Sequence, residues 1–229
     1  LQKWCLWIED ADAEEASKVR FINDRFNKVA NSRLESKKVA TQQYSETPYR
    51  FVERRFEAVQ KILVPTVSSS RRNYIPLGFI DSNIVVNAPN NMIHTSEPYI
   101  FSVIHSGMHM AWVRAIGGRL KSDYRYSTQL CYNTFPFPNI SEKQKEQLSE
   151  HVFNILDERE QHSEKTLAQL YDPNKMPDGL RQAHHNLDLA IEQCYRKKPF
   201  TSEELIARMR AYLERERHYN KLQSTLVEL

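Results

Sequence analysis

The stretch PYIFSVIHSGMHMAWVRAIGG, residues 98–118, is mostly apolar and ends in two glycines. A run of this length and hydrophobicity predicts a buried helix. Gly107 stands inside the run, and glycine weakens a helix because of the backbone freedom that it loses on folding. We therefore expect a buried helix over residues 98–116 that is interrupted near Gly107 and ended by Gly117 and Gly118.

Short apolar and β-branched runs lie on both sides of this helix, and each predicts a strand. They are KILVPTV (61–67), NYIPLGFI (73–80) and NIVVNAP (83–89) before it, and STQLCYNTF (127–135) after it. The polar loop SSSRR (68–72) and a turn at 81–83 separate the first three runs. The segment FPFPN (135–139) marks a boundary, because its two prolines stop both a helix and sheet pairing.

Helical patterns dominate outside these limits. Residues 12–43 predict one long helix that carries many cations, and Pro48 closes that part of the chain. Further helices are predicted at 141–161, 166–173, 177–196 and 201–219, the last with a capping box of Thr201 and Glu204. The expected fold class is α+β, with a basic helical connector (1–50), a mixed α/β domain (51–138) and a small C-terminal helical bundle (139–229).

The composition is that of an ordinary globular protein, with 40% hydrophobic and 27% charged residues among 229. No apolar run approaches the roughly 18 residues of a membrane span, so we expect no membrane partner. The three cysteines are far apart in the sequence. They suggest neither a disulfide framework nor a zinc cluster, and a reducing, cytoplasmic setting fits them best.

The net charge of +3 is unevenly distributed along the chain. Residues 1–138 carry 18 Lys and Arg against 13 Asp and Glu, whereas residues 139–229 carry 14 against 16. The excess is strongest in residues 18–72, where 13 cations face 5 anions. A basic segment joined to a near-neutral one indicates that the first part of the chain meets a polyanion such as nucleic acid.

Signatures of an autonomous enzyme are missing. The chain has five glycines and contains no GxGxxG, GxxxxGK[ST] or GxSxG motif, nor the acidic-Pro-Pro-aromatic segment of amino-methyltransferases. His105 and His109 have the spacing of zinc ligands on a helix, so a metal-dependent hydrolase is an alternative. However, HSGMH lacks a glutamate base, and Gly107 separates the histidines. We favour a buried, hydrogen-bonded pair, and predict no catalytic and no metal-binding residues.

Two long blocks carry a family resemblance. LVPTVSSSRRNYIPLGFI (63–80) and HSGMHMAWVRAIGGRLKSDYRYSTQLCYNTFPFP (105–138) resemble the DNA target-recognition domain of MmeI-like enzymes. These enzymes are single-chain type IIL restriction–modification proteins and class I adenine-specific DNA methyltransferases. LYDPNKMPDGLRQAHHNLDLAIEQCY (170–195) resembles their helical C-terminal domain, and WCLWIED (4–10) with the basic helix resembles the connection that leaves their methyltransferase domain.

The resemblance covers essentially the whole chain and implies a function. The chain would be the part of a site-specific adenine-N6 DNA methyltransferase that recognises double-stranded DNA, next to an upstream methyltransferase domain of the same chain. This segment alone would be no enzyme and hold no cofactor. The intact parent would use S-adenosylmethionine, and Mg²⁺ if a nuclease is present. The alternative is a non-catalytic DNA-binding or scaffold protein of a defence system.

The segment around Ser122 offers side chains that suit base recognition. If it is extended, Lys121, Asp123 and Arg125 project to one side. Lys121 would donate to guanine and Asp123 would accept from the paired cytosine, while Arg125 would contact a neighbouring purine. The resemblance supports this assignment, since the family's recognition residues occur in this segment with the same alternation. The alternative is a Lys–Asp ion pair on a free surface, which would contribute little stability.

Contacts to the DNA backbone are expected from the polar loop and one neighbouring cation. These residues are Ser69, Ser70, Arg71, Arg72 and Arg119. Guanidinium and hydroxyl donors suit phosphate oxygens, although the loop is also compatible with an exposed basic segment that contacts nothing. The cations of the N-terminal helix face either phosphates or solvent; they are Arg25, Lys28, Arg33, Lys37 and Lys38. The lysine pair 197–198 is more consistent with a solvated loop.

Overall fold

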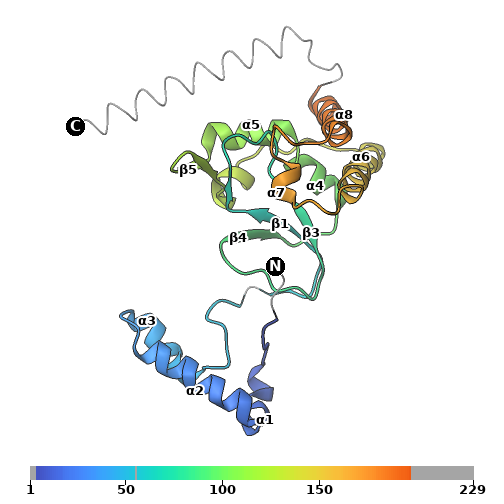
Figure 1. Ribbon diagram of the computed structural model, residues 1–229. Coiled ribbons are helices and arrows are strands. Elements are labelled where there is room, and N and C mark those ends of the chain that lie inside the picture. The colour runs from blue at the N-terminus through green and yellow to red at the C-terminus, as the bar shows by residue number, and fades with distance from the viewer. Residues whose placement is uncertain (1–3, 55, 197–229) are drawn as a thin grey trace, which may run out of the picture. The chain divides into compact units, whose positions relative to one another are not determined.

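The computed structural model describes residues 4–54 and 56–196. Its chain divides into two compact units, Leu1–Phe56 and Glu57–Leu229. Figure 1 labels the helices and most of the strands of these units. Helix and sheet are mixed in the second unit, which confirms the predicted α+β class. No helix within the described ranges is both long enough and apolar enough to cross a membrane.

The first unit is helical, but the single helix predicted over 12–43 is wrong. The chain forms the 3-10 turn η1 (Asp10–Asp12), then α1 (Ala13–Lys18), α2 (Arg20–Leu34), α3 (Val39–Gln42) and the 3-10 turn η2 (Gln43–Glu46). Val19 is extended, with φ −80° and ψ 108°, and its carbonyl accepts from the amides of Ile22 and Asn23. Lys38 is extended as well. At both residues the backbone angles leave the helical region of φ and ψ, so the helix is interrupted although the helical spacing of apolar residues continues in the sequence.

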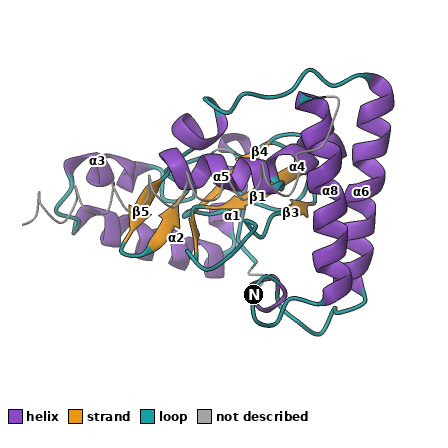
Figure 2. Cartoon of the chain, turned by 90° about the horizontal axis from the view of Figure 1, so that it is seen from above, coloured by secondary structure: helices purple, strands orange, loops and turns teal. Residues whose placement is uncertain are grey.

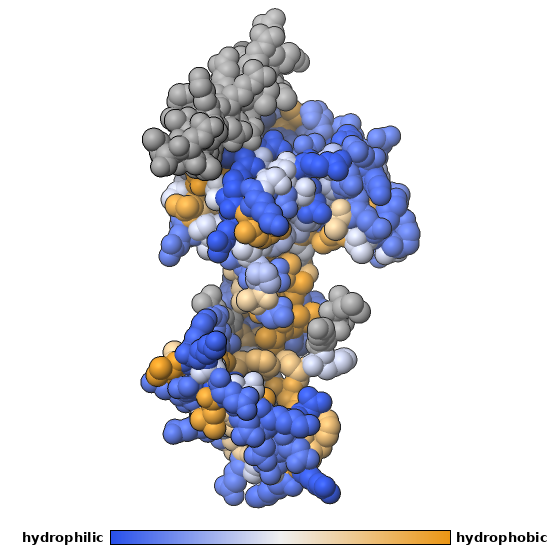
Figure 3. All heavy atoms as spheres, turned by 60° about the vertical axis from the view of Figure 1, so that its left-hand side comes forward, coloured by the Kyte–Doolittle hydropathy of each residue, from blue (hydrophilic) through white to orange (hydrophobic). Residues whose placement is uncertain are grey.

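Arg33 ties the end of α2 to the segment that follows it. Its guanidinium donates to the carbonyl oxygens of Tyr44 at 2.6 Å, Thr47 at 2.8 Å and Arg50 at 2.6 Å. The prediction that left Arg33 facing either phosphates or solvent is therefore corrected: the side chain is an internal brace. Large apolar side chains of this unit remain exposed, among them Phe21, Leu34 and Val39, and Figure 3 shows apolar patches between hydrophilic ones.

The second unit contains two small antiparallel sheets. The first has the order β3-β1-β4, from Gly78–Ile80, Lys61–Pro65 and Asn90–Ile93. The second has the order β2-β6-β5, from Val67–Ser68, Asp123–Arg125 and Gly118–Leu120. The chain passes from one sheet to the other at Thr66, whose carbonyl accepts from the Tyr126 amide at 2.7 Å.

The central apolar run forms two helices, as predicted. Helix α4 (Pro98–Ile104) and helix α5 (Gly107–Ile116) meet at His105 and Ser106, and the Ser106 hydroxyl caps α5 by accepting from the His109 amide at 3.2 Å. Phe101 and Ile104 of α4 enter the core beside the sheets, whereas Val103 enters the core beside the C-terminal helices. Helix α4 therefore lies between two cores, which is why nearly all of its faces are apolar.

Three strand predictions require correction. The run 73–80 contributes only β3, because Pro76 cannot donate to a ladder, and the run 83–89 gives no strand; β4 begins only after Pro89. Residues 127–135 do not close the sheet but contain a π-helical turn, η3 (Thr128–Tyr132). The Ser127 hydroxyl accepts from the Leu130 amide, a local cap that competes with strand pairing.

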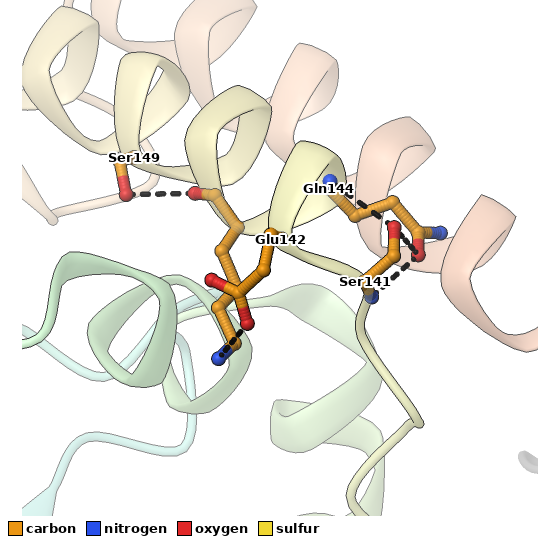
Figure 4. A network of polar contacts seen from close by, with 5 residues as sticks. Ser141, Glu142, Gln144 and Ser149 are labelled. Carbon is orange, nitrogen blue, oxygen red and sulfur yellow. Dashed lines mark hydrogen bonds and ion pairs between the residues drawn. The ribbon is translucent and has the colours of Figure 1, made fainter.

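The C-terminal helices appear as the sequence predicts. Helix α6 (Glu142–Glu160) and helix α8 (Asp178–Tyr195) pack side by side, with the short α7 (Leu167–Leu170) between them in the chain (Figures 1 and 2). Figure 4 shows the start of α6, where Ser141 and Gln144 form a capping box. The helix predicted at 201–219, its Thr201–Glu204 box and the lysine pair 197–198 lie outside the described residues.

Candidate nucleic-acid interface

The predicted base-reading residues lie on a β-hairpin rather than on one extended segment. Strands β5 and β6 pair from Gly118 opposite Arg125 to Leu120 opposite Asp123, which leaves Lys121 and Ser122 as a two-residue turn. Lys121 has φ 57°, in the left-handed region that favours glycine. The expectation that residues 121–126 are continuously extended is therefore wrong at Lys121, which occupies the tip of the hairpin.

Strand β6 keeps the predicted alternation. Tyr124 and Tyr126 are buried, with exposed fractions of 4% and 5%, and both belong to the core beside the sheets. Asp123 and Arg125 lie on the opposite face of the strand; Asp123 is half-buried and Arg125 is exposed, as is Lys121. The buried tyrosines fix the strand, so the charged face of the hairpin is held by the core.

Asp123 has a defined partner, but this partner is not Lys121. One carboxylate oxygen, Oδ1, accepts a hydrogen bond from the backbone amide of Ser70 at 3.2 Å. A simple Lys–Asp ion pair is thus not what the structure shows. The contact instead joins β6 to the 69–72 loop, so that the predicted base-reading and phosphate-contacting segments lie next to each other.

The arginines of the loop have protein contacts of different strength. Arg71 is exposed, and its Nη2 lies 3.8 Å from the Asp172 carboxylate, a solvent-exposed pair that contributes little stability. Arg72 donates weakly to the carbonyl of Ala168 at 3.5 Å, while its own carbonyl accepts from Arg114 at 3.0 Å. Arg71 can therefore leave its partner at small cost, whereas the backbone at Arg72 is held in place.

Arg119 serves the hairpin itself. Its guanidinium carbon lies 3.9 Å from the centre of the Tyr124 ring, and its Nη1 donates to the carbonyl of Ser122 at 3.3 Å. The cation–π contact and the hydrogen bond brace the two strands across the turn. The structure thus gives the predicted phosphate ligand Arg119 a role in supporting the turn that carries Lys121.

A buried polar network within the second unit was not predicted from the sequence. Arg159, only 8% exposed, donates to the Leu77 carbonyl at 2.9 Å, to the Tyr171 hydroxyl at 2.9 Å and to His105 Nε2 at 3.2 Å. The Tyr171 hydroxyl shares a hydrogen bond of 2.7 Å with His184 Nε2. These contacts connect α6 and α8 with the end of α4 and the segment before β3.

The two spaced histidines are core residues, as favoured from the sequence. His105 lies in the Arg159 network, and His109 Nε2 is 3.0 Å from the Tyr126 hydroxyl. Burial is the main cause that lowers the pKa of both histidines, to about 3 for His109. Within the described part of the chain, His, Cys, Asp and Glu form no group of three or more that could hold a metal ion.

Asp188 of α8, which is half-buried, forms a second set of polar contacts that sequence reasoning missed. Its Oδ2 accepts from the Tyr74 hydroxyl at 2.8 Å, and its Oδ1 accepts from the Gly107 amide at 2.7 Å. A signal was present in the sequence, since residues 184, 187, 188 and 191 share one helix face and the other three are fully buried. An aspartate among such positions indicates a carboxylate with specific hydrogen-bond partners.

A small sheet that holds charged side chains on a braced hairpin, next to a loop with hydroxyl and guanidinium donors, has the features of a nucleic-acid recognition module. The family comparison agrees with that class. Residues 1–139 match the model described as MmeI, target recognition domain, and residues 140–226 match MmeI, C-terminal domain. The chain belongs to this family, which confirms the resemblance that its sequence shows.

Two individual relatives agree with this family assignment. The chain is 40% identical over 202 residues to DNA methyltransferase A of Bacillus subtilis (strain 168), an alignment that covers 88% of the chain and 23% of the relative. It is 39% identical to the type IIL restriction-modification enzyme MmeI in a solved complex with DNA. That match has a TM-score of 0.82 and covers 96% of this chain and 29% of the other. The chain therefore spans between 23% and 29% of the length of these relatives.

Proposed function

We propose that this chain is the portion of a site-specific adenine-N6 DNA methyltransferase that recognises a specific double-stranded DNA sequence. The intact enzyme would also take part in restriction. The observation that carries the proposal is the hairpin at Lys121–Arg125, whose charged face is presented outward by buried tyrosines and joined to a polar loop. The solved MmeI structure with the same fold is a complex with DNA, which supports the proposal.

Lys121, Asp123 and Arg125 are the proposed base-reading residues. A guanine in the major groove presents the N7 and O6 acceptors, which suit Lys121 at the tip of the turn. Asp123 uses Oδ1 for the Ser70 amide, and its second oxygen is suited to accept from the N4 amino group of cytosine. A carboxylate is repelled by phosphates but not by that amino group. Arg125 lies two residues after Asp123 on the same face of β6 and would contact a neighbouring purine.

The 69–72 loop is the proposed contact to the DNA backbone. Ser69 and Ser70 offer hydroxyl donors, and Arg71 exchanges an exposed pair with Asp172 for a phosphate. Arg72 contributes a second guanidinium, while Arg119 acts mainly through the hairpin. Contacts of this kind supply affinity and alignment, and the hairpin supplies discrimination.

Methyl transfer belongs to the rest of the longer chain in this proposal. An adenine must leave the base stack to be methylated, so a separate element has to hold the duplex. The upstream methyltransferase domain would bind S-adenosylmethionine, and a nuclease, where present, would require Mg²⁺. The recognition module would work beside that domain in the same polypeptide, in the cytoplasm.

Mapping of methylated adenines tests the proposed function. Genomic DNA from cells with the intact gene and from cells in which it is deleted would be sequenced by a method that detects N6-methyladenine. We expect one defined sequence motif to be methylated only when the gene is present. If methylation is the same in both genomes, the adenine-methyltransferase assignment is wrong.

A further inference from the structure

The carboxylate of Asp188 connects three parts of the second unit. It belongs to α8, and it accepts one hydrogen bond from Gly107, the first residue of α5, and one from Tyr74. Tyr74 follows the 69–72 loop, and we call the longer segment that includes it the 69–74 loop. A Cβ added at Gly107 would lie 2.9 Å from Asp188 Oδ2. The close approach of the carboxylate to α5 therefore requires glycine at this position.

The 69–74 loop is attached at both ends. At one end, the Ser70 amide donates to Asp123 of the hairpin at 3.2 Å. At the other end, the Tyr74 hydroxyl donates to Asp188, and the Tyr74 ring stacks on His184 of α8 with a centroid distance of 4.0 Å. The loop thus spans from the C-terminal helices to the side chain proposed to read a base.

Stability alone does not explain a carboxylate at this place. Burial is the largest effect on the pKa of Asp188 and raises it to about 6, so its ionised form is disfavoured in the fold. An apolar residue of similar volume is often at least as stabilising as a buried charge. A carboxylate provides two directed acceptors, which fix the positions of Tyr74 and the Gly107 amide relative to α8.

We propose that Asp188 is a positioning residue for target recognition. By holding Tyr74 and the start of α5, it sets the 69–74 loop and, through the Ser70 amide, the Asp123 carboxylate at the DNA. The C-terminal helices would thereby determine how sharply the hairpin discriminates between bases. This inference rests on the proposed function, and it assigns the C-terminal helices a part in specificity rather than in support alone.

The test compares matched variants of the full-length methyltransferase. Tyr74→Phe removes one hydroxyl but keeps the ring that stacks on His184, and Asp188→Leu removes both acceptors. Asp188→Asn is the conservative replacement, because an amide can accept from Gly107 and donate to the Tyr74 hydroxyl. Tyr171→Phe is the control: it removes a buried hydroxyl from the Arg159 network, and it leaves in place the His184 and His105 rings through which that network contacts Tyr74 of the 69–74 loop.

The measurement is the ratio of affinities for the cognate duplex and for duplexes with one altered base pair, well below the unfolding temperature of each variant. We expect Tyr74→Phe and Asp188→Leu to lower this ratio by about tenfold, corresponding to about 1.4 kcal/mol. The slope of log affinity against log salt should be unchanged, since neither Tyr74 nor Asp188 is a proposed phosphate contact. Asp188→Asn should retain most of the ratio, and Tyr171→Phe all of it.

Two results would overturn the inference in distinguishable ways. If the unaltered protein discriminates but folded Tyr74→Phe does so equally well, Asp188 is only structural and the proposed function stands. If the unaltered protein shows no preference among duplexes, the proposed function fails and the inference fails with it. Should Asp188→Leu not fold, Tyr74→Phe still decides between these results.

Discussion

The carboxylate of Asp123 accepts a hydrogen bond from the backbone amide of Ser70, 53 positions earlier in the chain, at 3.2 Å. This contact joins the hairpin, which carries the side chains suited to base edges, to the loop, which carries the side chains suited to phosphates. Because phosphate contacts orient a protein on DNA and base contacts specify the sequence, a fixed link between them sets how the hairpin meets the bases.

Lys121→Gly is predicted to stabilise the protein while it weakens discrimination. Lys121 has φ 57°, a conformation that costs a non-glycine residue about 1–2 kcal/mol. Removing this strain should raise the free energy of unfolding by about 1 kcal/mol, and loss of the ammonium group should relax the preference for one base pair. Denaturant titration and duplex binding measure the two effects. Ser122→Gly is the control, because Ser122 lacks a positive φ and gains nothing; equal stabilisation of both variants would contradict the account.

Arg71→Ala is predicted to weaken binding to all duplexes by a similar factor. Arg71 forms a solvent-accessible ion pair with Asp172 at 3.8 Å, so loss of the Arg71 side chain should leave folding intact. If Arg71 contacts a phosphate, the slope of log affinity against log salt should fall by about 1. Lys143→Ala on the exposed surface of α6 serves as the control and should leave the slope unchanged. An unchanged slope in Arg71→Ala would remove this residue from the phosphate contacts.

Arg159→Leu is predicted to destabilise the fold severely. The substitution leaves the Leu77 carbonyl and the Tyr171 hydroxyl without their buried donor, which should cost about 3–5 kcal/mol. Arg159→Lys should recover only part of this loss, because an ammonium cannot reproduce the planar fork of a guanidinium. Arg181→Leu is the comparison: its long hydrogen bonds at 3.3 and 3.4 Å, one exposed and one half-buried, should contribute far less stability. Similar losses in denaturant titrations of Arg159→Leu and Arg181→Leu would refute the assigned role of the network.

His109 should make the protein less stable in acid. Burial lowers its pKa in the fold to about 3, below the ordinary value of 6.5, so the unfolded chain binds the proton more readily. The stability that the neutral His109 side chain contributes is fully present above pH 6.5 and is lost as the pH falls towards 3. At pH 4.5 the free energy of unfolding should be lower by about 2–3 kcal/mol. His105 and His184 act with the same sign. Asp188 acts with the opposite sign, because its raised pKa makes the folded state take up a proton between pH 3.8 and about 6.

Urea titrations at pH 7.5 and 4.5 measure this dependence. The unaltered protein should lose stability at the lower pH, and His109→Gln should lose about 2–3 kcal/mol less. Asp188→Asn should lose more than the unaltered protein, since the opposing contribution is gone. A pH dependence that His109→Gln leaves unaltered would show that His109 is not held neutral by burial.

The fold could be predicted where one local pattern decides the structure. The apolar run at 98–116, its break near Gly107 and the C-terminal helices follow from hydrophobic spacing and capping residues. Prediction failed where a single backbone angle or a local hydrogen bond decides. Val19 interrupts the N-terminal helix, and the Ser127 cap turns a strand-like run into a π-helical turn.

In the candidate site, the alternation of side chains could be predicted from the sequence, but the backbone geometry could not. The alternation at Asp123–Tyr126 is a property of sequence and was recovered, whereas the turn at Lys121 depends on which strand pairs with β6. The Ser70–Asp123 and Tyr74–Asp188 contacts join segments 53 and 114 positions apart, and spacing along a sequence carries no information about such pairs.

The measurement that tests the central claim most directly is the methylation motif of a double variant, Lys121→Ala with Asp123→Asn, in the full-length enzyme. Asparagine retains an acceptor for the Ser70 amide but no longer favours the cytosine amino group. The hairpin therefore stays in place while its preference among base pairs changes. We predict that the enzyme still methylates DNA and that the requirement for one G·C pair in its motif is lost or shifts. A motif identical to that of the unaltered enzyme would contradict the claim that this hairpin reads DNA sequence.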